Sequence, residues 1–153
     1  MRHSLGGVTL FITFFSFAVP LVHAAPPGNF QTTQIIGSGL TGPSGFDIAP
    51  DGRIFILQRT GEVLVYKNGV LLPQPFVVLP SAASGDRGLI GVAFDPDYYI
   101  NHYIYLYYTG VDLYNHLVRF DASGDVATGP ATILFETNVP STQLHVVDNT
   151  IWP

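Results

Sequence analysis

The sequence predicts an all-β fold of the β-propeller type, and three observations carry this prediction. Two stretches are nearly alike, Gly-Phe-Asp-Ile-Ala-Pro-Asp-Gly at 45–52 and Gly-Val-Ala-Phe-Asp-Pro-Asp at 91–97, and they start 46 residues apart. A period of roughly 40–50 residues built of strands and turns is typical of propeller blades. Short apolar runs are separated by turn residues, and after residue 24 no window shows sustained helical periodicity.

Turn residues divide the first period into strands. Pro50-Asp51-Gly52 suits a tight turn because proline presets φ and glycine accepts the left-handed region. Asn68-Gly69 is a strong signal for a two-residue hairpin. We therefore expect strands at residues 30–36, 45–49, 53–58, 62–67, 70–72 and 76–79.

The second period repeats this plan. Pro96-Asp97 and residues 123–125 provide the turns. The expected strands are residues 89–94, 103–109, 117–120 and 131–136. A blade is a four-stranded sheet, and about 4–8 blades close a ring. We therefore expect a partial six-bladed propeller of about two blades, too few to complete a ring.

Residues 1–24 have the pattern of a secretory signal peptide. Arg2 precedes the uncharged, mostly apolar run 8–22, and small residues suit cleavage before Ala25. The run of 15 residues is shorter than the roughly 18–20 that span a bilayer. We expect a secreted or periplasmic protein that leaves the membrane after cleavage, with residues 25–37 as a lead-in segment.

Composition excludes several classes of function. Without Arg2 the chain has five basic residues, scattered singly, against 11 acidic ones. A net charge of about −6 with no basic cluster argues against nucleic-acid binding. The sequence has no cysteine, which excludes disulfides, cysteine nucleophiles and cysteine metal sites.

Several blocks resemble one enzyme family. The block Gly-Asp-Arg-Gly-Leu-Ile-Gly-Val-Ala-Phe-Asp-Pro-Asp at 85–97, with Asn-His-Tyr-Ile-Tyr at 101–105 and Arg-Phe at 119–120, is similar to the glucose/sorbosone dehydrogenases. Residues 45–54 and 59–61 match the first blade of that family. The resemblance covers about residues 38–145, whereas residues 146–153 form a divergent tail.

The resemblance implies a six-bladed propeller that binds pyrroloquinoline quinone (PQQ) and Ca²⁺ at one end of its central channel. It also implies an aldose or similar polyol as substrate, oxidised by hydride transfer to the quinone. His145 takes the place of the family's general base, a histidine that follows the second blade. Asp86 stands where some members place a glutamine near the cofactor. The residues that hold Ca²⁺ come mostly from later blades, so no metal ligand is assigned here.

Other polar residues have simpler interpretations. We expect His102 and His116 at strand ends on the surface, without partners at metal-ligand spacing. Asp95 and Asp97 flank a proline and are expected to form a turn. Arg87 could form a loop-fixing ion pair with Asp86, or Asp86 could contact the cofactor. The tyrosines of 103–108 suit sheet packing better than a sugar platform.

Three hypotheses follow for the whole chain. The first is the N-terminal part of an exported PQQ-dependent sugar dehydrogenase, inactive alone, in which His145 is either the base or a tail histidine without a site. The second is a secreted, non-catalytic binding module that self-associates through open sheet edges. The third is a fragment without function. A frameshift after His145 would explain the unmatched tail 150–153, since Trp152 has the single codon TGG.

Overall fold

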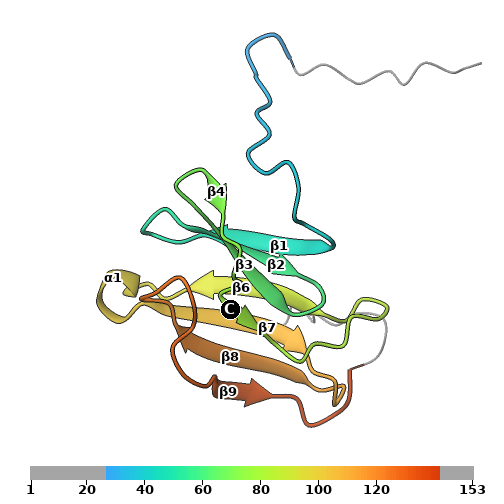
Figure 1. The fold of residues 1–153 in the computed structure, drawn as a ribbon. Helices are drawn as coiled ribbons and strands as arrows, with labels where there is room; N and C mark the ends of the chain where they lie inside the picture. Colours follow the sequence, from blue (N-terminus) through green and yellow to red (C-terminus); the bar gives the residue numbers. More distant parts are fainter. Residues whose placement is uncertain (1–26, 142–153) are drawn as a thin grey trace, which may run out of the picture. The chain divides into compact units, whose positions relative to one another are not determined.

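The computed structural model describes residues 27–141, and its regular structure consists almost entirely of antiparallel strands (Figure 1). The chain divides into two compact units after Thr33. In the described part of the first unit, residues 27–33, a turn is closed by the hydrogen bond from Phe30 N–H to the Pro27 carbonyl. The predicted signal peptide at 1–24 lies outside the described residues.

The strand expected at residues 30–36 is wrong. These residues form irregular structure with a bend at Ile35, and the Phe30 and Ile35 side chains are 72% and 56% exposed. An apolar run becomes a strand only when another strand accepts its backbone hydrogen bonds. No strand of the described chain pairs with this segment, so its β-branched residues do not suffice.

The first sheet has the strand order expected of a propeller blade. Strands β1 to β3 follow in sequence, and β4 and β5 both pair with β3, at its opposite ends. Pro73 and Pro75 lie between β4 and β5. Because proline has no N–H to donate to a strand ladder, these residues divide the outer strand into two short pieces. Asn68 and Gly69 have φ of 52° and 82°, which confirms the predicted two-residue hairpin. The strands are β1 (Pro43–Ile48), β2 (Ile54–Gln58), β3 (Glu62–Lys67), β4 (Val70–Leu71) and β5 (Val77–Val78).

The second sheet repeats the plan, and the 46-residue period holds at the level of register. Its order is β6-β7-β8-β9. A register shift lies between Pro43 and Gly45 in β1, and an equivalent shift lies between Leu89 and Gly91 in β6. The inner strands of the two blades are therefore structurally equivalent, irregularity included. The strands are β6 (Leu89–Phe94), β7 (Tyr103–Thr109), β8 (Asn115–Asp121) and β9 (Thr132–Glu136).

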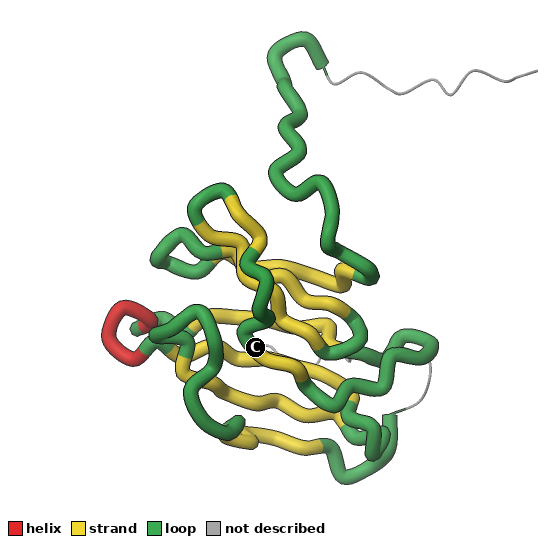
Figure 2. Tube along the Cα trace, in the orientation of Figure 1, coloured by secondary structure: helices red, strands yellow, loops and turns green. Residues whose placement is uncertain are grey.

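One helix was not predicted. Helix α1 (Tyr98–Asn101) lies between β6 and β7, where a turn at Pro96-Asp97 was expected (Figure 2). It is a single turn, too short for a 3.6-residue period to show in the sequence. Tyr98 is buried, and the left-handed φ of 54° at His102 ends the helix. No helix of residues 27–141 is long and apolar enough to cross a membrane.

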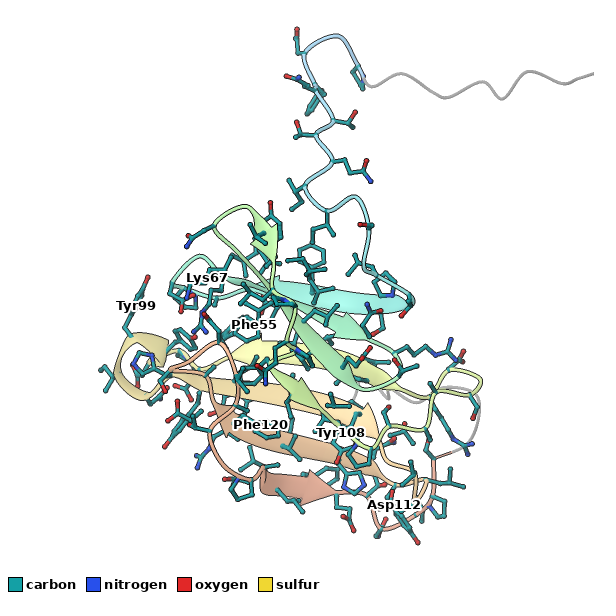
Figure 3. The ribbon with its side chains drawn as sticks, in the orientation of Figure 1. Phe55, Lys67, Tyr99, Tyr108, Asp112 and Phe120 are labelled. Carbon is teal, nitrogen blue, oxygen red and sulfur yellow. The ribbon has the colours of Figure 1, made fainter. Side chains whose placement is uncertain are left out.

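Aromatic side chains join the two sheets. Phe55 of the first sheet meets Phe94 of the second edge to face, with ring centroids 5.3 Å apart. Phe76 contacts Phe55 at 5.3 Å and Phe120 at 6.1 Å in the same geometry. Edge-to-face pairs add roughly 0.5–1.5 kcal/mol each to the burial of apolar area. These contacts place the shared core between the blades, where Figure 3 labels Phe55 and Phe120.

Candidate functional site

Asp86, Arg87 and His116 lie at one end of the second sheet. In register, Leu89 pairs with Tyr108, Tyr108 with His116, and His116 with Glu136. These four residues form a row that runs from the inner strand β6 to the outer strand β9. The loop with Asp86 enters the sheet at the inner end of this row.

Arg87 is held in a tight loop before β6. It is 8% exposed, and its guanidinium donates through Nη2 to the Ser141 carbonyl. The side chain of Arg59 reaches the same loop and donates to the Arg87 carbonyl at 3.0 Å. Gly88 has φ of 142°, and a Cβ there would lie 2.5 Å from Cγ of Arg59. Glycine at 88 thus allows this close packing, and Arg87 is buried against the end of the sheet.

Asp86 is exposed in this loop, beside the buried Arg87. The structure therefore places the predicted cofactor contact at a solvent-facing position, where a ligand could reach it. Arg87 fixes the loop through a carbonyl acceptor, and an ion pair between Arg87 and Asp86 stays a prediction.

The segment after β9 crosses the same end of the sheet. Thr137 N–H donates to the Asn115 carbonyl at 3.0 Å, and Ser141 N–H donates to the Leu113 carbonyl at 2.7 Å. The Ser141 carbonyl then accepts from Arg87. Residues 137–141 therefore lead from the outer strand back to the loop before the inner strand. His145, the predicted general base, lies outside the described residues.

His116 stands at the start of β8, as expected, but the expectation that it lies on the surface without partners is wrong. Its side chain is 8% exposed, and both ring nitrogens face carboxylates: Nε2 lies 3.1 Å from Asp112 Oδ1, and Nδ1 lies 3.1 Å from Glu136 Oε2. The imidazole also stacks on the Tyr108 ring, with centroids 5.0 Å apart. The hydrogen bond with His116 lowers the pKa of Asp112 below its ordinary value. The sequence could have suggested this cluster only through the i, i+4 spacing of Asp112 and His116.

The turn between β6 and β7 confirms the role predicted for the two aspartates that flank Pro96. Asp95 accepts from Asp97 N–H at 2.9 Å, from Asn101 Nδ2 at 2.8 Å and from the Tyr105 hydroxyl. The Tyr105 and Asn101 hydrogen bonds lower the pKa of Asp95. His102 caps α1 at the same end of the sheet and packs edge to face on Tyr98, 5.6 Å away.

The same end of the two sheets, opposite to the Arg87 loop, carries a polar cavity of about 490 Å³. Arg53, 5% exposed, pairs there with Asp51 at 2.7 Å and with Asp125 at 3.2 Å, and it donates to the Tyr98 hydroxyl at 2.7 Å. Lys67, labelled in Figure 3, pairs with Asp125 at 2.8 Å. These contacts fasten one blade to the other, so the cavity lines a structural junction.

Comparison with known proteins supports the architecture. The family model described as glucose/sorbosone dehydrogenase matches residues 40–147. An oxidoreductase from Thermus thermophilus, described as a glucose dehydrogenase, is 26% identical with a TM-score of 0.60, over 68% of this chain and 31% of that one. The PQQ-bound aldose sugar dehydrogenase of Streptomyces coelicolor is 26% identical with a TM-score of 0.60, over 72% and 34%.

A third solved structure gives the same match. The soluble aldose sugar dehydrogenase of Escherichia coli, in its apo form, is 25% identical with a TM-score of 0.57, over 66% of this chain and 31% of that one. The chain thus spans about a third of the length of the solved structures that it matches. The described residues 27–141 form two blade-like sheets, and this agrees with a third of a six-bladed ring. The predicted partial propeller is therefore confirmed.

Proposed function

Because the chain belongs to the glucose/sorbosone dehydrogenase family, we propose that it forms two blades of an exported oxidoreductase that oxidises sugar hydroxyls with PQQ. The observation that carries the proposal is the path of residues 137–141, which cross the sheet end from β9 to Arg87. The segment that precedes His145 in the sequence therefore lies beside the loop that contains Asp86, the predicted cofactor contact.

The residues of this loop fit an anionic quinone. Arg87 is buried and cationic, and its Nε has no hydrogen-bond partner among the residues that the structure describes. A buried donor without a partner is costly, and a charge-assisted bond to a carboxylate would satisfy it. Arg87 would therefore hold a carboxylate of PQQ, and the exposed Asp86 would accept a hydrogen bond from the cofactor or the sugar. PQQ, when bound, supplies the redox chemistry of the hydride.

His145 supplies the base in this proposal. It follows Ser141 by four residues, which span at most roughly 14 Å when fully extended. In this proposal the His145 imidazole takes the hydroxyl proton of the sugar, and removal of this proton makes the carbon a better hydride donor. His145 is thus proposed as the general base, and Arg87 as the residue that binds a carboxylate of the cofactor.

We further propose that the two blades do not turn over sugar alone. Large apolar side chains face solvent on strands that other blades would cover: Phe46 is 67% exposed on β1, and Ile133 is 62% exposed on β9. The Ca²⁺ implied by the family would be bound by such additional blades. In this view the chain binds PQQ through Arg87 but needs further blades to complete its ring and to turn over sugar.

Binding of PQQ to the full chain tests the role of Arg87. Quenching of protein fluorescence is titrated with PQQ in the presence of Ca²⁺ for the wild type, Arg87→Gln and the control Arg119→Gln. Arg119 lies over the Tyr103 ring at 4.0 Å, at the other end of the sheet. Arg87→Gln should weaken binding at least about tenfold, since it removes a charge-assisted hydrogen bond. Equal affinities of the two variants, or no binding by the wild type, would contradict the proposal.

Turnover is measured separately, as reduction of a dye by the PQQ-loaded chain with a panel of aldoses. We expect none. Turnover at the rate of full-length relatives would refute the need for further blades while leaving the cofactor site intact.

The second candidate, a non-catalytic module that associates through its open edges, is favoured by β9. All five residues of this strand are exposed, including Ile133, Leu134 and Phe135. An uncovered apolar edge strand is a template for pairing with another chain. Light scattering after size-exclusion chromatography distinguishes the candidates: a concentration-independent oligomer without PQQ binding supports the module.

A further inference from the structure

Three side chains with metal-ligating atoms face one another at the outer half of the second blade. Asp112, His116 and Glu136 each offer a ligand atom, and these atoms lie within 4.8 Å of one another. The group comprises one imidazole and two carboxylates from two strands and a loop. Within residues 27–141 it is the one cluster of this kind, and it is separate from the Arg87 loop at the inner strand.

The fold positions each member for a definite reason. His116 and Glu136 are cross-strand partners, so their side chains lie on the same face of the sheet. Asp112 comes back toward His116 in the loop between β7 and β8, which is closed by the hydrogen bond from Gly110 N–H to the Tyr114 carbonyl at 2.8 Å. Asp112 also accepts from Tyr114 N–H at 3.1 Å, which fixes the carboxylate. In Figure 3, Asp112 is labelled at the end of the sheet near Tyr108.

The imidazole of His116 has more acceptors around it than its neutral form can satisfy. Nε2 is 3.1 Å from both carboxylate oxygens of Asp112, and Nδ1 is 3.1 Å from Glu136. A neutral imidazole carries one N–H, so only one of these two contacts can be a hydrogen bond. The other contact sets a nitrogen lone pair against a carboxylate. A cation, either a second proton or a metal ion, must therefore lie between one nitrogen and its carboxylate.

The distances suit a metal ion between Nε2 and Asp112. Two ligands with bonds of about 2.0–2.1 Å to one ion are roughly 2.9–3.4 Å apart at octahedral to tetrahedral angles. The observed separation of 3.1 Å falls in this range. Glu136 would then accept the Nδ1 proton, as carboxylates do beside histidines that bind metals. The side chains of Asp112 and Glu136 are 51% and 50% exposed, which leaves the site open to an ion and its waters.

Gly110 packs directly against the two ligand atoms, which shows that the loop leaves no room for a side chain beside them. A Cβ at this position would lie 2.4 Å from Oδ1 of Asp112 and 2.7 Å from Nε2 of His116. Any larger residue would therefore push the two ligand atoms apart. On the other side, the Tyr108 ring stacks on the imidazole at an interplanar angle of 24° and keeps it in place.

We propose that His116 Nε2 and the Asp112 carboxylate bind a divalent transition-metal ion such as Zn²⁺, with Glu136 orienting the imidazole through Nδ1. Water molecules complete the coordination, because His116 and Asp112 supply only two ligands and the carboxylate side chains are half exposed to solvent. The ion fastens the β7–β8 loop to the sheet end. It has no part in hydride transfer, and the inference stands independently of the proposed cofactor site.

Zn²⁺ titration of the full chain tests the proposal. Affinity is measured at pH 7.5 by competition with a chromophoric chelator, and Co²⁺ binding is followed by its visible absorption as a report on ligand geometry. Asp112→Asn keeps the acceptor for Tyr114 N–H but loses the charge, and we expect it to weaken Zn²⁺ binding at least tenfold. Glu136→Gln should weaken binding about tenfold, as removal of a second partner of a ligating histidine does.

A matched control comes from the same sheet. His102→Asn changes a histidine at the opposite end, whose φ of 54° asparagine tolerates, and it should bind Zn²⁺ as the wild type does. Gly110→Ala keeps every ligand residue and should weaken binding, because its Cβ would clash with Asp112 Oδ1 and His116 Nε2 and displace both atoms. Circular dichroism without metal confirms that each variant is folded.

Two results would overturn the proposal. If Asp112→Asn and His102→Asn bind Zn²⁺ equally, the ion is bound elsewhere, for example by a histidine outside residues 27–141. If the wild type binds no Zn²⁺ at pH 7.5, the cluster is not a metal site, and its contacts only hold the β7–β8 loop to the sheet.

Discussion

Replacing Phe76 by alanine should separate the two blades energetically. Phe76 is 1% exposed and contacts Phe55 at 5.3 Å and Phe120 at 6.1 Å, so it links the first sheet to the second. Loss of its buried apolar area costs about 1.5–3 kcal/mol. Loss of two edge-to-face pairs adds roughly 0.5–1.5 kcal/mol each. We expect a decrease of about 3–5 kcal/mol in the free energy of unfolding, the range typical of buried phenylalanines.

The chain offers a control of the same residue type. Phe46 on β1 is 67% exposed, and its replacement by alanine should change stability by less than about 1 kcal/mol. Urea unfolding is followed by far-UV circular dichroism for the wild type, Phe46→Ala and Phe76→Ala. Phe76→Leu retains part of the contact, so it gives a measurable transition even if the alanine variant is largely unfolded.

Equal losses for Phe46→Ala and Phe76→Ala would refute this reasoning. Such a result would mean either that the blades do not share one core in solution or that the face of β1 is covered. A loss for Phe76→Ala below the roughly 1.5 kcal/mol expected from its burial alone would show that the interface between the blades contributes little.

Three further predictions concern acid stability, the Arg87 loop and export. Burial raises the pKa of Asp51, but the hydrogen bonds and charge of Arg53 outweigh it and leave this pKa lowered; a hydrogen bond from Lys67 likewise lowers the pKa of Asp125. The stability from these pairs is complete above the ordinary value of 3.8 and lost as pH falls below it. The melting temperature should therefore decrease as the pH is lowered from about 4 to about 2.5, and it should decrease less steeply in Asp125→Asn. Equal slopes of melting temperature against pH in the two proteins would contradict this. Gly88→Ala should destabilise the chain by about 1–3 kcal/mol in urea unfolding, because alanine is strained at a φ of 142° and its Cβ would meet Arg59. If export cleaves the predicted signal peptide, N-terminal sequencing of secreted protein should begin at Ala25, and an intact N-terminus would contradict it.

The strands could be predicted because their information is local. Strand β3 has the bounds expected from the alternation of Glu62–Lys67, and the turn residues before and after it set those bounds. Strand β8 begins at Asn115, two residues before the expected start at Leu117. Asn115 and His116 are polar types that favour the surface, yet both are buried. Their burial follows from partners on β7 and β9, which periodicity cannot reveal.

The candidate site was predictable only in part, for the same reason. The position of Arg87 in a loop before an inner strand follows from the block at 85–97, but its contact with Ser141 joins residues 54 apart in sequence. The cluster at His116 requires the register of β8 with β9, which sets Glu136 beside the ring. Spacing along the chain did show Asp112 four residues before His116, and this was the signal that could have been used.

The residues of the proposed metal site lie where the repeat is broken. Strands β1 and β6 agree in register and in the place of their irregularity, so the repeated residues specify sheet geometry and little else. The loops differ. Residues 59–61 turn between β2 and β3, whereas residues 110–114 connect β7 to β8 and carry Asp112. Because strands of a blade must pack alike while loops at their ends need not, the added loop residues are free to carry polar groups. A comparison of the two blades therefore singles out the longer loop at 110–114, with Asp112, as the place to test for a function that the repeat does not provide.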